Sequence, residues 1–478
     1  MANETQPGRI RAAAAVTLGR LSGVLSRRLR MGGGTSLPGT VARRVDPTIA
    51  SRLSRQLAKG SIIVTATNGK TTTCGLIAAI LRQAGLRVWR NREGANLING
   101  VTAALIIRAN LNGRLRRGEN TIAIFEVDEA AFPAVVRELQ PRAIVINNLF
   151  RDQLDRYGEV ETVATRWRET LAEVSPETML VLNADDPSIA ALSASFRGKA
   201  LFYGIDASQQ AILAEGKAGE QGQTIDARTC PNCGADLEYS LRFYSHIGHY
   251  TCPNCGHKRP TPALVATEVT KEQFDRQRVT LSGAEGTGAA LLALPGFYNV
   301  YNALAAATVA SGLGIEWSAV LAGLERFRPA FGRGETIEAE GRTLRLMLAK
   351  NPTGFTEVLR ALFAENPAKH LLLALNDNAA DGRDISWVWD VDFEQLAGKD
   401  LALTISGIRA DDLAVRLKYA GVSGAVEENI SAALTRAIEE TPPGETLYIV
   451  PTYTAMLAVR GELERRGYTA PYWEGKDA

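Results

Sequence analysis

Two closely spaced pairs of cysteines constrain the fold of this chain more than any other feature. Cys230-Pro-Asn-Cys233 and Cys252-Pro-Asn-Cys255 are separated by eighteen residues, a spacing typical of zinc ribbons. Four thiolates around Zn²⁺ can fold a segment that is too small to have its own hydrophobic core. Because four protein ligands leave no open coordination position, we expect the zinc to be structural. Two disulfides would instead require an oxidising compartment, which nothing else in the sequence indicates.

The size of the chain predicts two or three domains. It has 478 residues, of which 45% are hydrophobic, and its 54 basic and 52 acidic side chains give a net charge of +2. This balance provides no general attraction to nucleic acid or anionic lipid, so such a partner would need a local basic patch.

One local basic patch occurs at the N-terminus. The apolar stretch 12–25 is surrounded by arginines, namely Arg9, Arg11, Arg20, Arg27, Arg28 and Arg30. We expect residues 1–45 to form a basic helix and loop, which either packs on the body of the protein or also touches a membrane surface.

The same stretch is too short to span a membrane, because Arg20 interrupts it and a span needs ~18 unbroken apolar residues. No small-residue cleavage site follows at the distance expected of a secretory signal. We therefore expect a cytoplasmic protein, and a membrane-proximal position remains open.

Apolar runs alternate with helical periodicity in two parts of the chain, which predicts two α/β domains with mostly parallel sheets. We predict a central domain over residues 46–330, with the zinc ribbon inserted at about 226–262, and a Rossmann-like domain over 335–478. A hinge is expected at 328–334. The predicted strands lie at 61–66, 121–125, 143–146 and 179–182 in the first domain and at 370–375, 401–405 and 446–450 in the second.

A glycine-containing loop joins the first predicted strand to the helical pattern that begins at Thr71. Its sequence, Ala-Thr-Asn-Gly-Lys-Thr-Thr over residues 66–72, could point backbone N–H groups at the phosphates of ATP. Lys70 would reach the β- and γ-phosphates and Thr71 would bind Mg²⁺, while the remaining predicted contacts are Asn68, Gly69 and Thr72. Val64 stands where the strict P-loop pattern has glycine, so an ordinary strand-to-helix turn is the alternative.

Acidic residues follow the predicted strand 121–125. Glu126 is the candidate that we choose to hold Mg²⁺ and to assist catalysis, because open α/β sheets bind ligands at the carboxyl ends of their strands. Asp128 and Glu129 are close competitors, and a solvated acidic loop is the structural alternative.

The few cysteines and histidines leave no apparent pair for releasing ammonia from glutamine. Outside the four paired cysteines, Cys74 is expected to pack in a helix, and only His370 lies away from the predicted ribbon.

Three motifs resemble the central ATPase domain of Mur ligases and together span most of residues 46–330. They are Thr67-Asn-Gly-Lys-Thr-Thr72, Asn183-Ala-Asp-Asp186 and the run 296–303, Gly-Phe-Tyr-Asn-Val-Tyr-Asn-Ala. The resemblance implies that Asn302, with Asn299 as second choice, contacts the adenine side of ATP; without it these asparagines would be interpreted as helix-cap residues. Arg333, in the expected hinge, completes the predicted nucleotide-binding set.

The whole chain is more specifically similar to the Mur-ligase-like subunits of lipid II isoglutaminyl synthases. These subunits have a four-cysteine insertion and their own C-terminal domain, and the run 377–390, Asp-Asn-Ala-Ala-Asp-Gly-Arg-Asp-Ile-Ser-Trp-Val-Trp-Asp, resembles their C-terminal motif.

This resemblance implies an ATP-dependent carbon–nitrogen ligase of peptidoglycan synthesis. ATP would phosphorylate the α-carboxylate of D-glutamate in the stem peptide of lipid II, and ammonia would convert the acyl phosphate to D-isoglutamine. Ammonia would come from a GatD-like glutaminase subunit in a heterodimer. Asp384 would orient a histidine of that partner, although Asp377, Asp381, Asp390 and a purely structural loop carboxylate stay open. Trp387 and Trp389 are expected at the interface or in the core.

The sequence departs from the wider Mur family at two points. No lysine occurs between Thr71 and Gly198, where Mur ligases carry the carbamylated lysine of a second Mg²⁺ site. Gln153 stands where these enzymes usually have a metal-binding histidine, which leaves Asp152 as a tentative ligand only.

Two other functions compete with this interpretation. An amino-acid-adding Mur or folylpolyglutamate-type ligase would need no partner, but the cysteine module and the C-terminal motif argue against it. A nucleic-acid-binding NTPase would need a basic ribbon, yet between Thr229 and Pro260 the basic residues are only Arg242, Lys258 and Arg259. We therefore expect no nucleic-acid partner.

Overall fold

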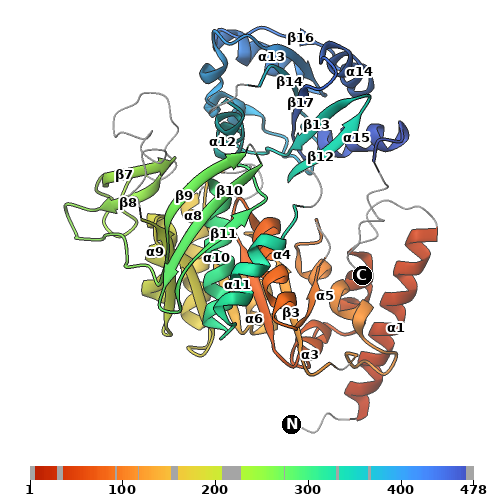
Figure 1. Ribbon diagram of the computed structural model, residues 1–478. Coiled ribbons are helices and arrows are strands. Elements are labelled where there is room, and N and C mark those ends of the chain that lie inside the picture. The colour runs from red at the N-terminus through yellow and green to blue at the C-terminus, as the bar shows by residue number, and fades with distance from the viewer. Residues whose placement is uncertain are drawn as a thin grey trace.

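The computed structural model describes residues 6–28, 36–91, 94–116, 118–151, 160–206, 228–273, 275–329, 333–363 and 368–469. Two large α/β sheets organise this part of the chain. The six-stranded sheet and its helices lie above the nine-stranded sheet in Figure 1, and a two-stranded hairpin projects from the side of the larger sheet.

The nine-stranded sheet has the order β11-β10-β9-β6-β5-β4-β1-β3-β2. Its strands are β1 (Ser61–Thr65), β2 (Arg87–Arg90), β3 (Thr121–Glu126), β4 (Ala143–Ile146), β5 (Met179–Asn183), β6 (Ala200–Ile205), β9 (Leu264–Gln273), β10 (Arg276–Gly283) and β11 (Gly286–Leu292). The strands from β2 to β9 pair in parallel, whereas β9, β10 and β11 form an antiparallel meander. The four predicted strands of this part are present, with Glu126 as the last residue of β3.

Helices cover both faces of this sheet, which explains why its central strands are continuous apolar runs. On one face Ile62 and Val64 belong to a core with α4 (Lys70–Gln83), α10 (Tyr298–Gly312) and α11 (Trp317–Arg326). On the other face Ile63 packs in a core with α3 (Ile49–Ser54), α5 (Ile98–Arg108), α6 (Phe132–Leu139) and α8 (Val160–Glu173).

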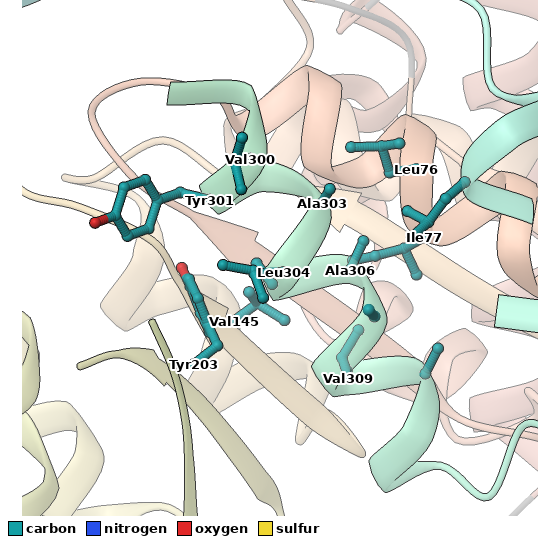
Figure 2. Packing of buried hydrophobic residues seen from close by; sticks show 14 of the residues in the cluster. Leu76, Ile77, Val145, Tyr203, Val300, Tyr301, Ala303, Leu304, Ala306 and Val309 are labelled. Carbon is teal, nitrogen blue, oxygen red and sulfur yellow. The ribbon is translucent and has the colours of Figure 1, made fainter. Parts of the chain in front are cut away.

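Helix α10 is buried along most of its length. Figure 2 shows Leu304 of this helix beside Val145 of β4, while Ala306 faces Ile77 of α4. Its small residues allow the helix to lie close to its neighbours, as required for a helix enclosed on several sides. Cys74 is 1% exposed in α4, which confirms the prediction that it packs in a helix.

The six-stranded sheet has the order β12-β13-β17-β14-β15-β16. Its strands are β12 (Arg333–Ala339), β13 (Arg342–Met347), β14 (His370–Ala374), β15 (Ala402–Ser406), β16 (Ala425–Val426) and β17 (Thr446–Pro451), with helices α12 (Pro352–Phe363), α13 (Ala410–Tyr419), α14 (Ile430–Glu440) and α15 (Tyr453–Arg465). The three predicted strands are β14, β15 and β17, and the antiparallel pair β12–β13 precedes them. The domain limits 46–330 and 335–478 stay a prediction.

The N-terminal helix α1 (Gln6–Arg28) packs against α2 (Leu37–Val45) and α5 at the edge of the molecule (Figure 1). Within the described residues, no helix is long and apolar enough to cross a membrane.

Candidate functional site

A cavity of about 340 Å³ lies between the two large sheets. One wall consists of the loop before α4 and the residues at the carboxyl ends of β3 and β4, and the opposite wall comes from β13, α12 and α15. Residues 67–72, Glu126, Asn299 and Asn302 all line the cavity. The structure therefore brings most of the predicted nucleotide-binding residues together at the edge of the sheet where open α/β folds bind ligands.

The loop turns sharply into α4 at Gly69, whose φ is +83°. A Cβ atom built on this glycine would lie 2.1 Å from Oδ1 of Asn302, so only glycine fits here. The first turn of α4 begins at Lys70, and the N–H groups of a first helical turn have no partner within the helix. This geometry is suited to a phosphate group.

Two polar pairs stand at the start of α4. Thr71 Oγ1 donates to Oε2 of Glu126 at 2.7 Å, which places the two predicted magnesium ligands side by side. Lys70 Nζ lies 2.8 Å from Oε2 of Glu129. All four side chains are buried, so these charges are held with little water between them. Glu129, named only as a competitor from the sequence, is the carboxylate that pairs with Lys70.

The two predicted asparagines belong to a buried amide network beside Gly69. Asn302 Nδ2 donates to Oδ1 of Asn299 at 2.8 Å, and Oδ1 of Asn302 accepts from Thr73 at 3.1 Å. The N-cap of α10 is Phe297, so the alternative of helix-cap asparagines is wrong. Arg333 is the first residue of β12 and its side chain lies outside the described residues, as does the segment with Asp152.

Three residues of this region were not found from the sequence, and two of them, Glu357 and Tyr244, line the cavity. Asn351 exchanges two amide hydrogen bonds with Asn68, at 2.9 and 3.2 Å, and so connects the two sheets. Glu357 of α12 is buried, which raises its pKa to about 7 despite Arg360 at 2.7 Å. Tyr244 comes from the cysteine module. No local sequence signal marks these three residues, because only tertiary packing brings them to this boundary between the sheets.

The four paired cysteines form a compact cluster. Their Sγ atoms all lie within 4.8 Å of one another, and Cys230 to Cys255 and Cys233 to Cys252 are each 3.5 Å apart. A disulfide would bring two sulfurs to ~2 Å, whereas tetrahedral thiolates around zinc stand further apart. The donor set and its spacing therefore fit a four-coordinate zinc ion.

The cysteine module ends in a hairpin, β7 (Glu238–Tyr244) and β8 (Ile247–Thr251), whose tip is buried. The cysteine cluster lies at the open end of this hairpin, and the tip places Tyr244 in the wall of the cavity. The ring of Phe150 lies 6.0 Å from Tyr244 and 5.0 Å from His246. The module is thus joined to the wall of the site at its tip.

Asp185 of the Asn-Ala-Asp-Asp motif fastens the module to the central sheet. It accepts from Arg259 Nε at 2.5 Å, from the Tyr301 hydroxyl at 2.8 Å and from the Ile205 N–H at 2.8 Å. Burial raises the pKa of Asp185, and Arg259 opposes this effect. This motif therefore contributes to docking of the module, and Asp185 does not line the cavity.

Comparison with known proteins shows two family matches. A Mur ligase middle domain matches residues 64–255 and a MurT ligase C-terminal domain matches residues 348–456. The MurT subunit of lipid II isoglutaminyl synthase (glutamine-hydrolyzing) from Staphylococcus aureus (strain COL) is 34% identical over 435 residues, which cover 90% of this chain and 93% of that protein. The chain belongs to the MurT family.

The MurT subunit from Streptococcus pneumoniae (strain ATCC BAA-255 / R6) is 33% identical and covers 94% of this chain and 97% of that protein. Solved Mur-type ligases share the fold. A pseudomurein peptide ligase type C from Methanothermus fervidus superposes with a TM-score of 0.64 at 23% identity, covering 85% of this chain and 78% of that one. MurF from Thermotoga maritima in complex with ADP superposes with a TM-score of 0.61 at 14% identity, covering 91% of this chain and 86% of that one. The predicted α/β Mur-ligase fold is therefore confirmed.

The C-terminal motif of this MurT-family chain presents four acids in different settings. Asp377 pairs with Arg409 at 2.7 Å, Asp381 is bonded to Thr454, and Asp390 lies 3.4 Å from Arg151. Asp384 is half-exposed and accepts from the Ser386 N–H at 2.8 Å, which lowers its pKa. Asp384 does not line the cavity, so any catalytic role would be exercised outside it.

The two motif tryptophans divide between core and surface. Trp387 packs on the core of the C-terminal sheet, whereas Trp389 is 53% exposed and its ring lies 5.5 Å from the ring of Tyr419.

Proposed function

We propose that this chain is the ATP-dependent ligase subunit of a lipid II isoglutaminyl synthase. The observation that carries the proposal is the shared cavity: Lys70, Thr71 and Glu126 of the Mur-type middle domain face residues of the MurT-type C-terminal domain across it. Relatives that add L-alanine to UDP-N-acetylmuramate match less of their own length, for example 55% of the enzyme from Aquifex aeolicus (strain VF5). An amino-acid-adding ligase is thus the weaker alternative.

In the first step, the γ-phosphoryl group of ATP is transferred to an oxygen of the D-glutamate α-carboxylate, which leaves ADP and an acyl phosphate. The N-terminus of α4 and Lys70 hold the phosphates, while Thr71 and Glu126 hold Mg²⁺, which neutralises charge on the phosphate oxygens when bound. Asn68, Gly69 and Thr72 complete the phosphate loop, and Asn299, Asn302 and Arg333 act on the nucleoside side. Exclusion of water from the buried site protects the acyl phosphate from hydrolysis.

In the second step, ammonia attacks the acyl carbon, the carbon–oxygen bond to phosphate breaks, and phosphate and a proton leave. A GatD-like glutaminase supplies the ammonia as the other half of a heterodimer. Asp384 is the acid that we assign to orient the partner's catalytic histidine, because it is half-exposed and lies outside the cavity. The nearby surface of Trp389, Val415 and Tyr419 is 53%, 49% and 76% exposed and is suited to hold the partner.

The proposed zinc ion is held by Cys230, Cys233, Cys252 and Cys255 and has a structural role. Because lipid II is anchored in the bilayer, the protein must work at the inner surface of the membrane, in the cytoplasm where ATP is available. No step of this reaction involves a nucleic acid.

The deciding experiment incubates the purified chain with lipid II, MgATP and ammonium and follows D-isoglutamine formation by mass. We expect amidation with ammonium, none with glutamine alone, and amidation with glutamine once the glutaminase is added. Lys70→Ala should abolish all activity, whereas Asp384→Asn should abolish only the glutamine-dependent reaction. ATP turnover without amidation under every condition would exclude the proposal.

A further inference from the structure

Helix α1 presents two different faces. Its inner face is made of small and apolar residues, and Ala12, Ala15 and Val16 are at most 2% exposed against the core of the central sheet. A Cβ on Gly19 would lie 2.7 Å from the carbonyl oxygen of Pro38, so α1 and α2 are in close contact. This packing fixes which side of the helix faces outward.

The outer face is apolar, which is unusual for a surface helix. Five large apolar side chains share it, and we call them the outer α1 stripe: Ile10 (70% exposed), Leu18 (47%), Leu21 (59%), Val24 (42%) and Leu25 (58%). Single exposed apolar residues are normal, but a continuous row along one helix marks an interaction site. Figure 1 shows α1 at the outer edge of the molecule.

The charge around the stripe is strongly one-sided. Residues 5–45 contain eight arginines and no lysine, aspartate or glutamate. Arg9 and Arg11 are exposed on α1, and Arg20 lies beside the stripe with a hydrogen bond to the Ala109 carbonyl at 3.0 Å. An apolar row bordered by arginines is typical of a helix that lies in the interface of an anionic membrane.

We propose that the outer α1 stripe docks the protein on an anionic lipid bilayer, with α1 parallel to the membrane plane. The leucines enter the boundary of the acyl chains, and the arginines bind the lipid headgroups. A second copy of the chain is a poorer occupant, because a two-fold interface would place the same arginine-rich segments against each other. The proposal deepens the proposed function, since it brings the cavity to a substrate that is held in the bilayer.

The first test measures co-sedimentation of the full chain with vesicles that contain no lipid II. We expect binding to vesicles of equal parts phosphatidylglycerol and phosphatidylcholine, little binding to phosphatidylcholine alone, and weaker binding as salt rises. The variant Leu21→Glu/Leu25→Glu should lose roughly tenfold in affinity. The matched control, Ile408→Glu/Val426→Glu, adds the same charge at exposed positions of the C-terminal sheet region and should bind like wild type.

The second test compares substrates with ammonium as nitrogen source, so that no glutaminase is needed. Leu21→Glu/Leu25→Glu should amidate a short-chain, water-soluble lipid II analogue normally and lose activity on lipid II in anionic vesicles. Loss with both substrates would instead indicate damage to the site. Equal vesicle binding by this variant and wild type, or a dimer in light scattering that the variant converts to monomer, would overturn membrane docking without affecting the proposed ligase activity.

Discussion

At the scale of single residues, the loop before α4 depends on the absence of a side chain at Gly69. The left-handed φ of +83° disfavours a Cβ, and the 2.1 Å approach to Asn302 excludes one. Gly85, just after α4, has a similar φ of +79°, but no atom lies within 4 Å of the position that a Cβ would take there. Substitutions at the two glycines therefore distinguish the effect of backbone strain, present at both, from the effect of a steric clash, present only at Gly69.

We expect Gly69→Ala to lower both the melting temperature and the affinity for ATP, because Asn302 must move out of its network. Gly85→Ala should lower the free energy of unfolding by only ~1 kcal/mol, because alanine is disfavoured in the left-handed conformation. It should leave the affinity for ATP unchanged. Calorimetry and titration with MgATP measure the two effects. Equal losses of ATP affinity in both variants would contradict the steric role of Asn302.

Glu357 provides a second residue-scale prediction. Its pKa is raised to about 7 in the folded protein from 4.5, so the folded state favours the protonated acid. The contribution of this group to stability is complete below pH 4.5 and is lost as pH rises through 7. Glu357→Gln cannot ionise, so we expect its stability relative to wild type to improve between pH 5 and pH 8 by up to about 3 kcal/mol.

Denaturant unfolding at several pH values measures this difference. Glu439→Gln, which removes an exposed carboxylate from α14, is the charge-matched control and should show no such trend. If the difference in free energy of unfolding between Glu357→Gln and wild type stays constant from pH 5 to pH 8, Glu357 does not titrate in this range.

At the scale of elements, the hairpin β7–β8 connects the cysteine cluster to the cavity. A zinc ion bound by the four cysteines would hold its two open ends together, while its tip packs Tyr244 and Ile247 into the core that contains α4 and α10. Removal of the metal should therefore act at a distance, on the cavity wall, because the hairpin is too small to hold its shape by burial alone.

We expect a zinc-selective chelator, used with excess Mg²⁺, to speed hydrogen exchange of residues 238–251 and to weaken ATP binding severalfold. Added Zn²⁺ should restore both. Tyr244→Ala should weaken ATP binding while leaving the hairpin protected from exchange. This variant therefore distinguishes the effect of the Tyr244 side chain on the cavity from the effect of the metal on the hairpin. Unchanged exchange in the chelated protein would show that the cluster does not support the hairpin.

The sequence predicts helices and strands better than it predicts the contacts between residues that are far apart in the chain. Strands such as β1 and β4 were found because both faces are buried and the segments are short apolar runs. The common position of Lys70, Thr71 and Glu126 in the cavity wall could be predicted because one strand–loop–helix unit and its neighbouring strand place them together. Asn351 was missed because its partner Asn68 is 283 positions away, and only packing of the two sheets brings the amides into contact.

At the scale of the whole molecule, the cavity exists because the C-terminal sheet closes over the loop before α4. The reciprocal amide pair Asn68–Asn351 is a direct polar contact across this boundary, and Asn351 also accepts from the Gly354 N–H at 2.8 Å at the start of α12. Both walls of the site are therefore aligned by contacts that no single domain contains.

We expect Asn351→Ala to loosen this arrangement without unfolding either sheet, because the lost bonds lie at the boundary. The radius of gyration in solution scattering should increase, and KM for ATP should rise by roughly tenfold, in line with the loss of two hydrogen bonds. Asn378→Ala is the matched control, since Asn378 bonds Thr454 within the C-terminal part at 2.8 Å. A variant with unchanged scattering and an unchanged KM would mean that apolar packing alone holds the sheets together, and that the amide pair is a consequence of closure and not its cause.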